Sequence, residues 1–194
     1  GIEDRSLIKY HRMAGWVRSG ASAKLQAIRV TLPQKPNFAR EEAVPVPANL
    51  DWNLWLGPAQ EQPYHENIVH YNWHWFWDFG NGEIGNQGVH QMDIARWAIP
   101  GATLPESAIS MGGRWTIDKD RKDQAETPNQ QVTAFKFGET ILLFEVMSLC
   151  GKSPITEKNV PGRVSNEFYL EAGKIVDGKF FPKGSDQGEA LVDA

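Results

Sequence analysis

Four side chains capable of hydrogen bonding or proton transfer recur at helical spacing near the middle of the chain. They are Asn86, His90, Asp93 and Trp97, separated by 4, 3 and 4 positions. Residues three and four apart share one face of an α-helix, so a regular helix would gather amide, imidazole, carboxylate and indole in one stripe. Imidazole suits general acid–base catalysis near neutral pH. These four side chains are therefore predicted to line a binding or catalytic site. The alternative is that His90 is an interior histidine hydrogen-bonded to Asp93.

The residues just before this stripe contain G-x-G-x-x-G, at positions 80, 82 and 85. This spacing is typical of turns that bind the pyrophosphate of dinucleotides, where it follows an apolar strand and precedes a second buried strand with an acidic residue about 20 positions on. Here the preceding residues are WHWFWDF, and Glu106 has no convincing buried strand before it. The glycines therefore indicate a tight turn that leads into a helix.

A metal site is an alternative use of the imidazoles that precede the glycines. Imidazole and carboxylate are ligands that suit zinc or a non-haem metal, and the available side chains are His65, His70, His74 and Asp78. Their spacing matches no compact ligand signature, and a strand would put only some of them on one face. We therefore predict no metal ligands.

Composition and charge exclude several functions. The 194 residues allow one substantial core, and a formal net charge of -4 with scattered basic residues predicts no nucleic-acid partner and no anionic membrane surface as partner. No apolar run is long enough to span a bilayer. Cys150 is the only cysteine, so no intrachain disulfide can form.

Hydrophobic periodicity and turn residues predict the elements that position these side chains. Residues 6–19 read as a helix with Ser6 as N-cap and Gly20 as its end, and residues 89–99 read as a second helix closed by Pro100 and Gly101. Residues 34–49 read as a long loop. Short β-rich runs are expected at 24–33, 70–79, 131–138, 140–149, 166–176 and 179–184. The pattern predicts an α+β fold, with a mostly antiparallel sheet and helices packed on one face.

The segment GNGEIGNQGVHQMD resembles a motif, G-G-x-x-x-D-x-G-x-H-x-x-D, of the glucose–fructose oxidoreductase, inositol dehydrogenase and MocA (Gfo/Idh/MocA) family. Further similarity to that family's C-terminal α/β domain lies in GIEDRS, SGASAKLQAIRV, LDWNLWLGPA and NEFYLEAGKIV, so it covers nearly the whole chain. The resemblance implies that residues 1–24 are the end of a Rossmann domain with a connecting helix. Residues 25–194 would then form the substrate-binding and oligomerisation domain.

The same resemblance implies a cofactor and a cellular context. A separate Rossmann domain would bind NAD or NADP and carry a Glu-Lys-Pro motif with a catalytic lysine, and neither motif occurs in this chain. Because the chain starts at Gly1 with a strand-like stub, we expect it to be a fragment without redox turnover of its own. Both the cytoplasm and the periplasm of a bacterium are compatible with this resemblance.

Site residues follow from the motif positions. His90 matches the family's acid–base histidine, and Asn86 occupies the place of an aspartate, which removes a charge but keeps hydrogen bonding. Asp93 is expected to orient the helix or fix the His90 tautomer. Arg5 is expected to contribute to cofactor binding and to shape the junction with the cofactor domain.

The expected substrate is a sugar or polyol. Aromatic rings offer stacking faces for sugars, although core packing is the alternative for any single tryptophan. The residues expected to contact substrate are Tyr64, His70, Trp73, His74, Trp75 and Trp77. The resemblance also implies a homo-oligomer assembled through the sheet. Two other functions stay open: a non-catalytic carbohydrate-binding or assembly module, and an NAD-dependent sugar lyase or glycosidase of the same family.

Overall fold

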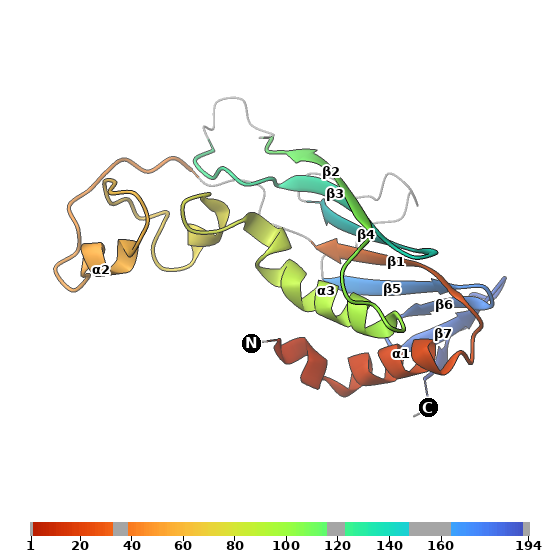
Figure 1. The fold of residues 1–194 in the computed structure, drawn as a ribbon. Coiled ribbons are helices and arrows are strands. Elements are labelled where there is room, and N and C mark those ends of the chain that lie inside the picture. The colour runs from red at the N-terminus through yellow and green to blue at the C-terminus, as the bar shows by residue number, and fades with distance from the viewer. Residues whose placement is uncertain (1, 33–38, 116–122, 148–163, 192–194) are drawn as a thin grey trace.

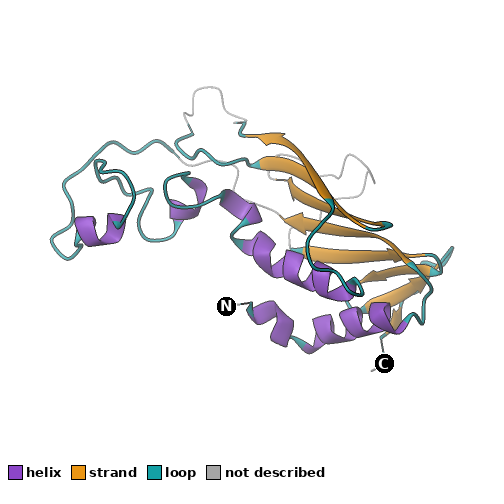
Figure 2. Ribbon diagram, in the orientation of Figure 1, coloured by secondary structure: helices purple, strands orange, loops and turns teal. Residues whose placement is uncertain are grey.

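The computed structural model describes residues 2–32, 39–115, 123–147 and 164–191, so Cys150 lies outside the described residues. The two longest helices lie on one side of a large sheet, and shorter helices lie in an arm that extends beyond it, as Figure 2 shows. The helices, with η marking a 3-10 helix, are η1 (Glu3–Ser6), α1 (Ile8–Ser19), α2 (Trp52–Leu56), η2 (Asn72–Trp75), η3 (Gly82–Ile84) and α3 (Gln87–Ala98). The strands are β1 (Leu25–Leu32), β2 (Ser107–Gly113), β3 (Gln130–Phe137), β4 (Thr140–Met147), β5 (Ser165–Leu170), β6 (Gly173–Val176), β7 (Lys179–Pro182) and β8 (Glu189–Ala190).

The sheet has eight strands in the order β2-β3-β4-β1-β5-β6-β7-β8. Its strand pairs are antiparallel except for the parallel pair β1–β4. Tight turns join two pairs of neighbouring strands: Gly138, at φ 58°, lies between β3 and β4, and Asp177 and Gly178, at φ 52° and 76°, lie between β6 and β7. Two successive positive φ values are typical of a tight hairpin turn. The predicted α+β class and mostly antiparallel sheet are confirmed.

The core lies between the sheet and the helices α1 and α3, which lie side by side (Figure 1). Alternate residues of the central strands point into it, among them Ile28, Phe144 and Phe168, all fully buried. Met13 of α1 and Ile94 of α3 fill the same core. Each such side chain contributes about 1.5–3 kcal/mol when it leaves water. Helix α1 therefore shares one core with the sheet. The domain boundary expected after residue 24 stays a prediction.

The other face of the sheet combines exposed apolar residues with a buried ion pair. Ile109 and Met111 of β2 are 69% and 73% exposed. Towards the sheet centre, Arg29 of β1 pairs with Glu145 of β4, and the two side chains are 10% and 1% exposed. A charge buried to this extent requires a partner.

The first helix ends as predicted but begins differently. Gly20 adopts the left-handed conformation, at φ 72°, and its N–H donates to the carbonyl of Val17. Ser6 is not the N-cap of this helix, because it closes the preceding 3-10 turn η1, and Leu7 takes the cap position.

Residues 39–86 form an irregular arm beside the sheet (Figure 1). The strand expected at residues 70–79 is wrong: Asn72–Trp75 is the 3-10 helix η2, followed by turns. Its backbone is paired from far along the chain, since the N–H of Glu126 donates to the carbonyl of Trp75. None of the helices in the described part of the chain has the length and apolar character that a membrane crossing requires.

Candidate active site

A hollow of about 330 Å³ lies where the arm meets the start of α3. It is lined by Trp73 and His74 of η2, by Asn86 and His90 at the beginning of α3, and by Ile2, together with the glycine turn between them. Four residues that the sequence identified as site residues therefore share one hollow. The others lie elsewhere.

His90 is a half-buried side chain in the second turn of α3. Its Nδ1 atom is buried and makes no hydrogen bond with any described residue. A buried polar atom without a partner costs free energy, which a bound ligand can recover by supplying the hydrogen bond. His90 also lines the hollow, so its imidazole lies beside any molecule bound there.

Asn86 is the N-cap residue of α3, yet its side chain makes no capping hydrogen bond. Instead its Nδ2 donates to Oε1 of Glu83 over 3.1 Å. Glu83 is 6% exposed, and burial raises the pKa of its carboxyl, against the opposing effects of the Asn86 hydrogen bond and the charge of His74. The sequence reasoning missed Glu83, because nothing in its local pattern distinguishes it from an exposed turn residue.

Gly82 and Gly88 allow this part of the chain to pack closely. Gly82 has φ 73°, and a Cβ there would lie 2.8 Å from Oγ1 of Thr127. A Cβ at Gly88 would lie 2.6 Å from the carbonyl oxygen of Glu83 and 2.9 Å from the ring of Phe144 in β4. The glycines thus let α3 and its leading turn approach the sheet. Gly82 is the member of the G-x-G-x-x-G spacing with positive φ, and a 3-10 turn occupies the place of a phosphate loop.

The second half of the predicted stripe packs against the N-terminal segment. Arg5 donates from Nε and Nη2 to the two carboxylate oxygens of Asp93, over 2.7 and 2.6 Å. The Arg5 guanidinium also lies 4.8 Å from the centre of the Trp97 ring, and His11 meets that ring edge-on at 4.7 Å. Asp93 therefore serves as the partner of Arg5, and the alternative hydrogen bond to His90 Nδ1 is absent from the described part of the chain.

Trp73 lines both the site hollow and a second one. Its ring stacks on His74 with centroids 3.7 Å apart, and His74 Nδ1 is bonded to the carbonyl of Tyr71. The second hollow, of about 400 Å³, has Trp73 in common with the first and is lined also by Trp55, Leu56, Pro58, Ala59, Asp78 and Phe79. Sequence reasoning missed Trp55 and Phe79, whose rings lie 4.9 Å apart. The Trp-x-x-Trp spacing of Trp52 and Trp55 was the available signal.

The remaining substrate candidates lie outside both hollows. Tyr64 is buried edge-on against Trp52, and Trp75 is buried beside Ala125. Trp77 is 57% exposed, and His70 is exposed as well. Burial or distance from the hollows separates these four side chains from Trp73 and His74.

Acidic, imidazole and thiol side chains do not gather in groups of three or more within the ranges the structure describes. His65 is half-buried beside Phe76, with ring centroids 5.5 Å apart, and burial lowers its pKa. His74 instead stacks on Trp73. The alternative metal site therefore gains no support.

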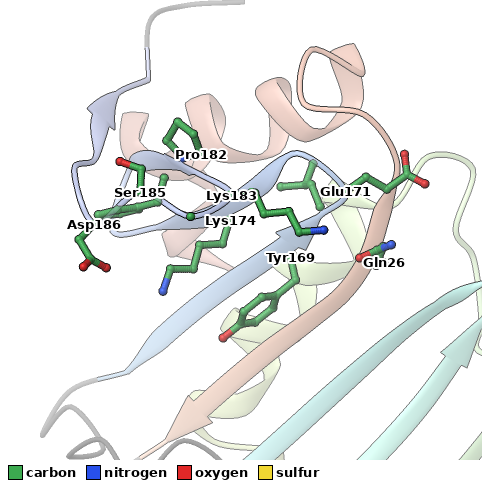
Figure 3. A pocket seen from close by; sticks show the side chains of 12 residues that line it. Gln26, Tyr169, Glu171, Lys174, Pro182, Lys183, Ser185 and Asp186 are labelled. Carbon is green, nitrogen blue, oxygen red and sulfur yellow. The ribbon is translucent and has the colours of Figure 1, made fainter.

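A third hollow, of about 490 Å³, lies over β5, β6 and β7, away from α3 (Figure 3). Lys174 and Lys183 extend on either side of the Tyr169 ring. Burial raises the pKa of Tyr169, and its hydroxyl donates to Glu167 over 2.5 Å. Glu171 and Asp186 also line this hollow, so its charges are mixed and favour no single class of ligand.

The comparisons with known proteins agree with the fold. Residues 36–111, which include the site hollow apart from Ile2, match the Gfo/Idh/MocA family model described as "Oxidoreductase family, C-terminal alpha/beta domain". No curated protein sequence matches the chain. An oxidoreductase from Thermotoga maritima superimposes with a TM-score of 0.56 at 13% identity, over 100% of this chain and 46% of that one.

Two dehydrogenases with bound ligands have the same fold. The WlbA dehydrogenase from Bordetella pertussis, in complex with NADH and UDP-GlcNAcA, gives a TM-score of 0.56 at 13% identity, over 100% of this chain and 44% of that one. Levoglucosan dehydrogenase with NADH and levoglucosan gives 0.52 at 14% identity, over 93% and 44%. The chain thus spans less than half the length of these proteins. The predicted resemblance is confirmed: residues 36–111 match the model of the C-terminal domain of the Gfo/Idh/MocA oxidoreductase family, and the chain shares its fold with these oxidoreductases.

Proposed function

We propose that this chain is the substrate-binding part of an NAD(P)-dependent oxidoreductase that acts on a hydroxyl-bearing carbon of a sugar or polyol. The observation that carries the proposal is His90, which lines a hollow together with Asn86 and Trp73 and whose buried Nδ1 has no hydrogen-bond partner among the described residues. An acid–base group, an amide and an aromatic face are the components needed to deprotonate and hold a sugar hydroxyl.

His90 acts as the acid–base residue. In the oxidative direction it accepts the proton of the substrate hydroxyl, and in the reductive direction it returns that proton to the carbonyl oxygen. NAD or NADP, when bound, supplies the hydride acceptor for the hydrogen on the same carbon. The Asn86 amide holds the reacting oxygen, and Trp73 provides a surface for the sugar ring.

The second hollow extends the substrate site. Because Trp73 lines both hollows, a substrate that stacks on its ring reaches Trp55 and Phe79 with the rest of its structure. Asp78 adds a carboxylate acceptor there, and Gln62 Nε2 donates to it over 3.0 Å. Aromatic faces beside a carboxylate suit a second sugar ring or another flat polar group.

The described residues do not themselves form a dinucleotide site. The glycine turn follows a 3-10 helix and further turns instead of a strand, and the guanidinium of Arg5 is occupied by Asp93. We therefore assign cofactor binding to a separate domain, with Arg5 acting at the junction through η1. The NADH complexes of the WlbA dehydrogenase and levoglucosan dehydrogenase support a nicotinamide cofactor.

Self-association through the sheet is part of the proposal. The exposed side chains of Ile109 and Met111 lie on the face opposite the helices, and exposed apolar patches of this kind mark protein contacts. Light scattering of the purified chain tests it: a dimer or larger assembly that a charged substitution at Met111 dissociates is expected, and a monomer at all concentrations contradicts it.

The function is tested by reading the coding sequence upstream of Gly1 and assaying the complete protein with NAD⁺ and NADP⁺ against a panel of sugars and polyols. Accumulation of reduced cofactor supports the proposal. Cleavage of a glycosidic bond without net reduction indicates instead the sugar lyase or glycosidase alternative. Sugar binding without any turnover indicates the carbohydrate-binding module.

A further inference from the structure

Glu83 is a buried carboxyl that the proposed acid–base step does not use. It lies in η3, one residue after Gly82 and three before Asn86, and is 6% exposed. It does not line the site hollow itself, whereas Asn86 does. Any effect of Glu83 on a ligand must therefore pass through another side chain.

The hydrogen bond between the two residues determines how the Asn86 amide is oriented. Nδ2 donates one hydrogen to Oε1 of Glu83, so this end of the amide faces Glu83 and Oδ1 points elsewhere. An ionised carboxylate only accepts hydrogen bonds and requires the Nδ2 end. A protonated carboxyl has an O–H, which can instead donate to Oδ1. The ionised carboxylate therefore requires one orientation of the amide, and protonation also permits the opposite one.

The groups around Glu83 have opposing effects on the protonation of its carboxyl. Burial disfavours the ionised carboxyl, which the hydrogen bond from Asn86 and the charge of His74 favour, and the net result is a raised pKa. His74 is the titratable group that faces Glu83 from η2. Helix α3 contributes the uncharged Asn86 amide, and the side chain of Thr127 packs against the neighbouring Gly82.

We propose that Glu83 is a positioning residue whose protonation decides which end of the Asn86 amide faces the hollow: the Oδ1 acceptor when Glu83 is ionised, and the Nδ2 donor when it is protonated. The chemical consequence rests on the proposed function. A substrate hydroxyl has one hydrogen, which it donates to His90 in the proposed step, so the alcohol oxygen and the ketone oxygen both need a donor from Asn86. Protonated Glu83 thus presents the Nδ2 donor that holds the reacting oxygen, and ionised Glu83 presents an acceptor that competes with His90 for the hydroxyl hydrogen.

The orientation can be tested on this chain without any substrate. Two-dimensional NMR follows the Glu83 carboxyl carbon and the Asn86 side-chain amide through a pH titration. We expect the Glu83 midpoint to lie above the usual 4.5 and the Asn86 signals to shift with the same midpoint. The proposal is overturned if the Asn86 signals do not shift as Glu83 titrates, or if the Glu83 midpoint lies at the usual 4.5.

A neutral variant separates Glu83 from the neighbouring imidazoles. Glu83→Gln removes the titration and should abolish the Asn86 transition, whereas Glu106→Gln, at an exposed carboxyl paired with Lys136, should leave it unchanged. A transition that persists in Glu83→Gln arises from His74 or His90 and contradicts the proposal. The wild-type titration decides the question even if Glu83→Gln fails to fold. Because no sugar or cofactor is involved, failure here is distinct from failure of the proposed function.

Discussion

The guanidinium of Arg5 donates two hydrogen bonds, of 2.7 and 2.6 Å, to the carboxylate of Asp93. This pair joins η1 to α3 across 88 positions of sequence. The Arg5 and Asp93 side chains are 39% and 17% exposed, so solvent weakens the pair without removing it. The contact holds the N-terminal segment, and with it Ile2, against the helix that carries His90.

A double-mutant cycle measures this contact. Arg5→Met, Asp93→Asn and the double variant should give a coupling free energy of about 1 kcal/mol in urea unfolding, because the pair is bidentate but partly exposed. The exposed pair Lys136–Glu106, joined through one 3.0 Å contact, is the matched control and should couple more weakly. Additive effects at Arg5 and Asp93 would show that the contact contributes nothing to stability.

Gly88→Ala should destabilise the chain by about 1–3 kcal/mol, since the new methyl group would overlap the Glu83 carbonyl and the Phe144 ring. Gly15→Ala in α1 is the control, because no atom outside its own stretch of helix backbone lies within 4 Å of the added Cβ. It should stabilise by about 0.5–1 kcal/mol, as alanine is the better helix former. Thermal unfolding of both variants checks the pair, and equal effects would contradict the packing of α3 on β4.

The raised pKa of Glu83 links stability to pH with a definite sign. The folded chain binds this proton more tightly than the unfolded chain does, so the contribution to stability is full below the usual pKa of 4.5 and is lost as pH rises through the folded value. The Glu83→Gln variant cannot titrate at this position, so it has no such loss of stability. Relative to Glu83→Gln, the wild type should therefore become less stable in urea unfolding as the pH rises above 4.5. A constant difference, or one of opposite sign, would contradict the burial.

Trp73→Ala should weaken sugar binding about tenfold, a loss of about 1.4 kcal/mol, because the ring lines both hollows. Trp77→Ala is the control: its ring is exposed and lines neither hollow. Saturation-transfer NMR with aldohexoses and their methyl glycosides measures both variants. Equal losses would exclude a specific role for Trp73, and a larger loss in Trp77→Ala would place the sugar elsewhere.

Elements with strong local signals could be predicted from the sequence. Helix α3 has regular apolar spacing and ends before Pro100, and the hairpin turns have glycines where φ must be positive. β2 was not predicted as a strand, because it lies at the edge of the sheet and its residues are exposed on both faces. An alternating pattern arises only where one face is buried.

The candidate site likewise has residues that local spacing predicted and residues that it did not. The helical spacing of Asn86 and His90 predicted that they share a face, and both line the hollow. Alternating aromatics at 70–79 resembled a strand, but residues 125–127 pair with this segment and hold it as a 3-10 turn: Trp77 N–H donates to Glu126. The roles of Glu83 and of Arg5 depend on contacts between elements, which no local spacing records.

Replacing His90 in the complete protein tests the central claim most directly. His90→Gln should lower kcat for sugar oxidation by about 10²–10⁴-fold while KM changes little, because the proton acceptor is lost and the hollow keeps its shape. His70→Gln, at an exposed histidine outside the hollow, should retain normal turnover. Wild-type kcat in His90→Gln would contradict the assignment of His90 as the acid–base residue.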